Sequence, residues 1–162
     1  MKYIILVLSL LACGDTPQEL NPSDIWLVVY EVYTEALTEP RPECEAWLAN
    51  TQVLATGARI PGTNEILSAA AGPTALGRHT VANGRSYIWC ERGYDADRIN
   101  TCYGHEYLHA LRYCQRGSAD GDHVDDALWC DHGFLCEDFR GANTDSVEFR
   151  VNEILWAQAI SQ

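Results

Sequence analysis

The sequence predicts an α+β domain that combines several helices with a small, mostly antiparallel sheet and is stabilised by disulfides. Three observations support this fold class: helical patterns lie near both ends and in the third quarter of the chain, a β-hairpin signal precedes the third-quarter helix, and six cysteines follow Cys13. The chain has 162 residues, 47% of them hydrophobic. Beyond a short leader, this length fits one domain of ordinary size.

The chain begins with an expected export signal. Residues 1–12 place one lysine before an apolar run shorter than the roughly 20 residues of a membrane-spanning helix, which is typical of a signal peptide. The stretch Leu10-Leu11-Ala12-Cys13 resembles the lipobox of bacterial lipoproteins, although Leu11 is not the small or β-branched residue favoured there. The resemblance implies cleavage before Cys13 and a lipid on its sulfur.

A lipid at Cys13 implies an exported, membrane-anchored protein. Gly14, rather than Asp, follows the cysteine, which in Gram-negative lipoproteins favours the outer membrane. Residues 13–22 are then a lipidated tether and residues 23–162 form the domain. The net charge of −12 argues against nucleic acid as a partner, because an acidic surface repels phosphates.

The first element of the domain is a predicted helix over residues 23–37. Its β-branched content also favours a strand, but a helical stripe and a cap at Ser23 or Asp24 favour a helix. Residues 44–76 are weakly patterned, with possible short strands at 52–56 and 66–70. The helical stripe consists of Ile25, Val28, Val29, Val32 and Ala36.

The middle of the chain predicts a hairpin followed by a helix. Two β-like runs, 78–82 and 85–90, are joined by Asn83-Gly84, a dipeptide that tolerates the positive φ angles of a type I′ turn. Asp97 is the expected cap of a helix over 98–114, and the glycine-rich stretch from Gly117 ends that helix.

The last quarter predicts an irregular segment and a final helix. Residues 122–143 lack a pattern, and residues 144–160 form an amphipathic helix. Asp145 and Glu148 are spaced as a capping pair. The expected core positions of this helix are Val147, Val151, Ile154 and Leu155.

The six cysteines after Cys13 suggest three disulfides, because an even number is typical of an exported domain. Their pairing is left open, and the absence of a Cys-x-x-Cys pair argues against a thiolate zinc site. The cysteines concerned are Cys44, Cys90, Cys102, Cys114, Cys130 and Cys136.

The chemistry is expected at His105-Glu106-Tyr107-Leu108-His109. Two histidines at i and i+4 project from one face of a helix, so both imidazoles can reach one cation. A glutamate beside the first histidine can accept a proton from a metal-activated water and later donate it to a leaving amine.

This pattern resembles the HExxH signature of the zincin metallopeptidases. The resemblance implies a zincin-like core, in which the active-site helix packs on the small sheet. It also implies zinc as cofactor, held by His105 and His109, and a peptide or protein substrate. Glu106 would be the general base, and Tyr87–Cys90 would be the strand that lines the cleft.

The third ligand is less determined. Arg112 and Gln115 stand where the metzincin motif has glycine and histidine, so that longer form is absent. His123 is the favoured ligand, because it follows the glycine-rich reversal that turns the chain back toward the helix. The alternatives are His132, Asp122 or Asp125, and the late glutamates Glu148 and Glu153.

The acidic neighbours of His123 permit two other interpretations. Asp122, Asp125 and Asp126 could accept hydrogen bonds from the rings of zinc-bound histidines. The same three residues and Asp120 could also bind calcium, but the order of an EF-hand loop is not met, and a solvated acidic loop is favoured over calcium.

The expected function is therefore zinc-dependent hydrolysis of peptide bonds with a zinc-activated water. The alternative is a catalytically inactive zincin-fold surface lipoprotein that binds a partner, sequesters zinc or supports the cell envelope. Glu106 disfavours this alternative, because metal binding alone needs only the ligands.

Overall fold

The computed structural model describes residues 16–37, 41–66, 76–92, 94–130 and 143–161. Within these residues the fold is α+β, with four helices and one three-stranded sheet. The expected signal peptide, the lipobox with Cys13, and residues 131–142 with His132 and Cys136 lie outside the described residues. Most of the possible strand at 66–70 also lies outside them.

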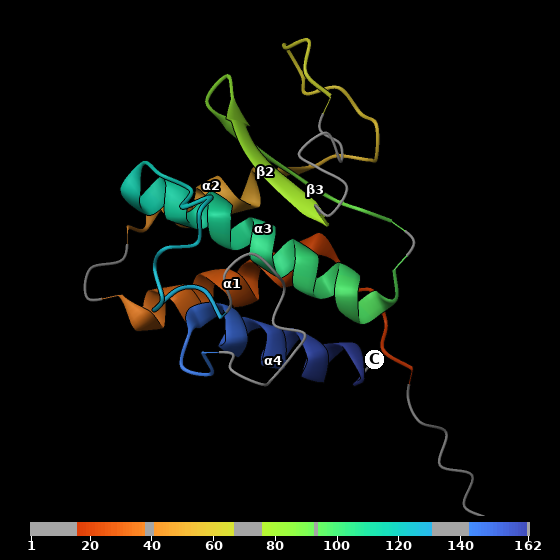
Figure 1. Cartoon of the computed structure of the whole chain (residues 1–162), viewed down its shortest axis with the longest axis vertical. Coiled ribbons are helices and arrows are strands. Elements are labelled where there is room, and N and C mark those ends of the chain that lie inside the picture. Colours follow the sequence, from red (N-terminus) through yellow and green to blue (C-terminus); the bar gives the residue numbers. More distant parts are fainter. Residues whose placement is uncertain (1–15, 38–40, 67–75, 93, 131–142, 162) are drawn as a thin grey trace, which may run out of the picture.

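Helix α3 (Ala96–Arg116) lies at the centre of the molecule, between the strands and the helices α1 and α4 (Figure 1). It begins two residues before the expected start, because Asp95 rather than Asp97 is the cap and accepts the Arg98 N–H at 3.2 Å. Gly117, with a φ of 75°, ends the helix as expected. The HExxH sequence therefore lies in the middle of a long, well-capped helix.

The predicted hairpin is confirmed. Strands β2 (Gly77–Ala82) and β3 (Arg85–Cys90) pair antiparallel from Ala82 opposite Arg85 to Gly77 opposite Cys90. Asn83 and Gly84 have φ angles of 50° and 70°, the two positive values that a type I′ turn requires. The hairpin packs on α3 through both of its strands.

A third strand completes the sheet. Strand β1 (Gln52–Val53) is shorter than the run expected at 52–56 and pairs parallel with β3. The strand order is β1-β3-β2, so β3 is central and β2 forms one edge of the sheet in the described part of the chain. The sheet is small and mostly antiparallel, as the sequence predicted.

Helix α1 (Pro22–Ala36) confirms the first predicted helix, with one difference at its start. Asn21 is the N-cap and Pro22 occupies the first turn, whereas Ser23 or Asp24 was expected as the cap. Four of the five stripe residues are buried, while Ala36 is exposed and Tyr33 is buried in addition. A short helix α2 (Glu43–Ala49), which the weak pattern did not predict, follows and contacts α1 and α3.

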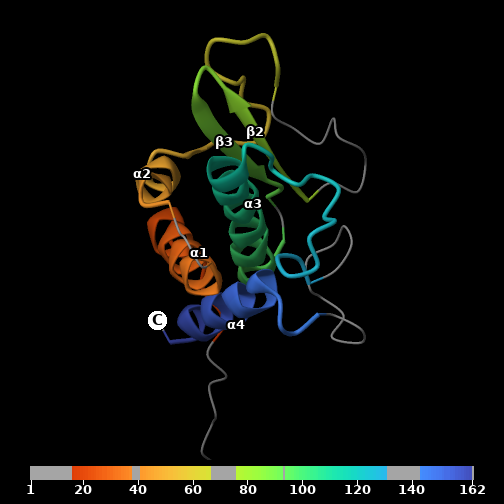
Figure 2. The same cartoon turned by 90° about the vertical axis from the view of Figure 1, so that its left-hand side faces the viewer.

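Helix α4 (Val147–Ala159) crosses α1 and α3 on the side away from the sheet (Figure 2). It begins later than expected, because Ser146 is the cap and accepts the Phe149 N–H at 3.2 Å; the capping pair predicted from Asp145 is wrong. Ile154, expected in the core, is 38% exposed. Gly104 of α3 permits the close approach of α4, since a Cβ there would lie 2.9 Å from Leu155 Cδ1.

Two disulfides fasten α3 to its neighbours. Cys90–Cys102 joins the end of β3 to the helix, and Cys44–Cys114 joins α2 to it across a sequence separation of 70 residues. In the chain-entropy model the longer loop contributes about 4 kcal/mol to the free energy of unfolding. Cys130 is also disulfide-bonded. The two bridges attach on either side of the HExxH sequence and hold that part of α3 against the sheet and α2.

Among the residues that the structure describes, no helix is long and apolar enough to cross a membrane.

Candidate metal centre

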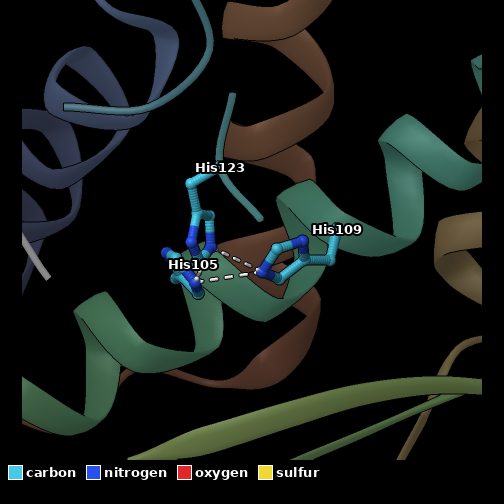
Figure 3. A group of neighbouring side chains, drawn as sticks. All are labelled: His105, His109 and His123. Atoms are coloured by element: carbon cyan, nitrogen blue, oxygen red, sulfur yellow. Dashed lines mark hydrogen bonds between the residues drawn. The ribbon is translucent and has the colours of Figure 1, made fainter. Parts of the chain in front are cut away.

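Three histidine side chains converge beside α3. His105 and His109 project from the helix one turn apart, and His123 reaches them from the loop that follows the helix (Figure 3). The three Nε2 atoms are mutually 3.1 Å apart. The structure thus brings the predicted ligands together and includes His123, the favoured third residue.

The outer nitrogens of the two helical histidines are held by acceptors. His105 Nδ1 lies 2.6 Å from Glu148 Oε1, and His109 Nδ1 lies 2.6 Å from the carbonyl oxygen of Ala119. Because a carboxylate and a carbonyl only accept, each Nδ1 must carry the proton. In a neutral imidazole this leaves a lone pair on Nε2, which is the atom that faces the other two histidines.

Hydrogen bonds alone cannot satisfy the triangle of Nε2 atoms. Each of these nitrogens is either a donor or an acceptor, so three mutual contacts contain at least one pair with the same role. A cation between them satisfies all three lone pairs at once. Zinc–nitrogen bonds of about 2.0–2.1 Å in tetrahedral geometry place two ligands about 3.3–3.4 Å apart, close to the observed spacing. The three histidines can therefore hold a metal ion.

The electrostatic surroundings favour neutral rings at two of the three positions. Burial, followed by repulsion from His105, holds the pKa of His109 well below its ordinary value, and the same two causes lower the pKa of His123. Burial opposes a charge on His105 as well, but the hydrogen bond to Glu148 and the negative charges of Glu148 and Glu106 together outweigh burial and raise the pKa of His105. The neutral form is the one that binds a metal ion.

Glu148 has a role that the sequence did not reveal. It was interpreted as a capping residue and as a less favoured ligand, but it is fully buried. One carboxylate oxygen orients His105, and the other accepts the backbone N–H of Cys130 at 3.0 Å. The sequence feature that could have indicated this role is a glutamate between two apolar residues, Val147 and Phe149, which are both buried. An acidic side chain on a buried face requires a partner.

Glu106 is buried beside the histidines but has few partners. Its side chain is 4% exposed, and its Oε2 atom has no hydrogen-bond partner among the described residues. Burial raises its pKa to about 7. A Cβ at Gly77 would lie 2.5 Å from Glu106 Oε1, so only a glycine in β2 leaves room for this carboxylate. A buried carboxyl group with a pKa near neutrality suits the exchange of a proton.

Of the other proposed ligands that the structure describes, none joins the group of His105, His109 and His123. Asp122 and Glu153 are exposed. The Asp125 carboxylate accepts the Ala127 N–H and lies 3.9 Å from the Arg112 guanidinium. The acceptors that hold His105 and His109 are Glu148 and the Ala119 carbonyl rather than these aspartates. His132 lies outside the described residues.

The strand expected to line the cleft is the central strand of the sheet. Tyr87–Cys90 belongs to β3, which pairs with β2 along its length and with β1 at Tyr87 and Ile88. The neighbouring strand β2 approaches the site, with Gly77 beside Glu106. Its His79 ring stacks at 6.3 Å from the His109 ring, while His79 Nε2 lies 2.7 Å from Ser86 Oγ and takes no part in the triangle.

Comparisons of the chain with protein-family models, with curated proteins and with solved structures give no match. The chemistry of the site therefore rests on its own geometry.

Proposed function

We propose that the chain is a zinc-dependent metallopeptidase with a zincin-like core. One observation carries the proposal: three Nε2 atoms face one another at 3.1 Å, and two of them have their outer nitrogens committed as donors. The buried Glu106 next to His105 extends the proposal from metal binding to catalysis.

Zinc is the proposed metal because of the donor set. Three neutral imidazoles leave a fourth position of a tetrahedron open, which is the arrangement of catalytic rather than structural zinc sites. Imidazole also binds copper, nickel and iron, so the metal content of the purified protein is part of the test. A zinc ion here would supply Lewis acidity, which activates water and polarises a carbonyl oxygen.

In the proposed reaction, Glu106 moves protons. Its carboxylate accepts a proton from the attacking water and donates it to the nitrogen of the scissile peptide bond as that bond breaks. Its burial supports this role, because a carboxyl group with a pKa near neutrality can both take up and release a proton. A protein that only sequesters zinc gains nothing from a buried carboxylate whose Oε2 atom lacks a hydrogen-bond partner within the described part of the chain.

Strand β2 is the proposed binding edge for an extended peptide. Support comes from Gly77, which is in contact with Glu106, and from His79, which stacks on His109. Backbone groups on the outer edge of a strand can add a peptide as a further strand. A peptide bound there would run past both the proposed general base and the metal position.

The decisive experiment compares Glu106→Gln with Glu153→Gln in the purified chain. Each variant loses one carboxylate, but only Glu106 is buried beside the histidines. Wild type is expected to bind about one zinc ion per chain and to cleave a peptide library. Glu106→Gln should keep the zinc and lose at least about a hundredfold in rate, while Glu153→Gln should match wild type.

Two outcomes would contradict the proposal. Full peptidase activity in Glu106→Gln would refute the assigned mechanism. Stoichiometric zinc without cleavage of any peptide by wild type would favour the inactive binding or zinc-sequestering module.

We also propose that a lipid on Cys13 anchors the protein to the outer membrane. The segment that follows is held against the domain: the Leu20 N–H donates to Asn100 Oδ1, and Asn100 Nδ2 donates to the Gln18 carbonyl, both at 2.9 Å. Gln18 and Leu20, which were expected in the tether, are therefore bonded to the domain. The wild-type protein should partition into the detergent phase, and Cys13→Ala should not. Equal partitioning of the two proteins would contradict the proposed lipid anchor.

A further inference from the structure

The loop that carries His123 is built around the carboxylate of Asp120. This side chain is 9% exposed, and both of its oxygens accept hydrogen bonds from the loop. Oδ1 accepts the Val124 N–H at 3.4 Å, and Oδ2 accepts the Asp125 N–H at 3.2 Å. These two donors directly follow His123, so the carboxylate fixes the backbone on which the third histidine stands.

The same carboxylate also binds Trp129. Its Oδ2 atom accepts the indole N–H at 2.7 Å, and the Trp129 side chain is 3% exposed. The indole packs against all three histidine rings, with centroid distances of 4.9 Å to His105, 4.4 Å to His109 and 4.6 Å to His123. Trp129 is thus an aromatic support for the whole triad, and Asp120 determines its orientation.

The backbone of this loop requires such support. Asp120 and His123 have φ angles of 54° and 51°, in the left-handed region that costs most side chains about 1 kcal/mol or more. The His123 N–H donates to the Asp120 carbonyl at 3.0 Å, which closes the turn. A conformation of this kind persists only where surrounding contacts determine it.

We propose that Asp120 and Trp129 form a clasp that holds His123 in place as a preformed third ligand. This inference rests on the proposed metal centre. Asp120 is a positioning residue: it acts through the loop backbone and through Trp129 and does not itself ligate the metal. The clasp assembles the site before an ion arrives, so binding does not have to order the loop.

The test measures zinc affinity by competition with a chelator in three variants. Asp120→Asn keeps the size of the side chain and tolerates a positive φ, but it replaces one accepting oxygen by a donating amide. Trp129→Phe keeps an aromatic ring and removes the indole N–H. Asp122→Asn is the control, because it removes the same charge from an exposed residue next to His123.

Zinc affinity should fall about ten- to a hundredfold in Asp120→Asn, as is typical when a partner of a ligand is lost. Trp129→Phe should also lower the zinc affinity. In the double variant, the fold-loss of zinc affinity should be smaller than the product of the fold-losses in the two single variants. Such non-additivity is expected when two residues act through one hydrogen bond. Asp122→Asn should stay within about threefold of wild type, well below that range.

A spectroscopic measurement separates positioning from general destabilisation. With cobalt in place of zinc, the visible absorption of Asp120→Asn should differ from that of wild type, because the third imidazole is displaced while His105 and His109 remain. If one variant fails to fold, as judged by circular dichroism, the other still tests the clasp.

The outcomes distinguish this inference from the proposed function. Wild-type zinc affinity and cobalt spectrum in a folded Asp120→Asn or Trp129→Phe would overturn the clasp and leave the metal centre intact. Failure of wild type to bind zinc would overturn the metal centre first, and the clasp with it.

Discussion

The three histidines come from two parts of the chain, helix α3 and the loop that follows it, and different contacts hold these two parts in place. His105 and His109 are carried by a long helix that is capped at both ends and fastened to β3 and α2 by disulfides at Cys102 and Cys114. His123 stands on a loop in left-handed backbone, held by hydrogen bonds to Asp120. All three nitrogen separations are nevertheless 3.1 Å.

This comparison separates local from tertiary determinants of a metal site. The spacing of His105 and His109 follows from the period of a helix, so any stable helix at this position would provide it. The position of His123 depends on contacts with Asp120. Substitutions that disturb these contacts should therefore displace His123 and leave the helix unaffected.

The largest expected effect is the loss of zinc when either kind of ligand is removed. His109→Ala suits a helix and His123→Asn suits a positive φ, so each substitution respects its backbone. Zinc content, measured by atomic absorption, should fall from about one ion per chain to almost none in both variants.

His79→Gln is the control for the ligand variants, because His79 is partly buried beside the site but lies outside the triangle. It should keep about one zinc ion per chain. Full zinc in His123→Asn, together with its loss in His109→Ala, would show that the loop histidine is not a ligand and would end the comparison between the two parts of the chain.

An intermediate effect is expected from the partner of His105. Glu148→Gln preserves the shape of the side chain but removes the charge that orients the imidazole, so zinc affinity should fall about ten- to a hundredfold. Glu153→Gln on the exposed side of the same helix should leave the affinity unchanged. Equal affinities in a chelator competition would mean that the helix alone orients His105.

The smallest effect on zinc is expected at Gly77. An alanine Cβ there would meet Glu106 Oε1, Cys102 Sγ at 2.7 Å and the Trp89 carbonyl oxygen at 2.9 Å. Gly77→Ala should therefore lower the free energy of unfolding by about 1–3 kcal/mol and reduce peptidase activity more than zinc affinity.

Gly121→Ala is the matched control, since a Cβ at that glycine meets nothing within 4 Å. Its free energy of unfolding, measured by denaturant titration, should stay within about 0.5 kcal/mol of wild type. A Gly77→Ala protein as stable and as active as this control would show that β2 can shift away from Glu106 without cost.

The predicted elements with strong local signals are those that the structure confirms. Asn83-Gly84 determined the hairpin, Gly117 ended α3, and apolar stripes identified α1 and α4. Helix α2 was missed because seven residues carry too little pattern. The start of α4 was misplaced because the cap is not Asp145 but its neighbour Ser146, which is buried and accepts the Phe149 N–H.

The sequence by itself determined the part of the site that lies within one helix: two histidines on one face and a glutamate beside the first. Only the tertiary structure decided the partners of these residues. Glu148 from α4 and the Ala119 carbonyl from the loop accept hydrogen bonds from the two helical histidines. Asp120 holds the loop of His123 through Trp129 and two backbone N–H groups. The physical reason is that helical spacing is a property of the local backbone. A hydrogen bond across 43 residues, such as that from His105 to Glu148, exists only after the core has packed.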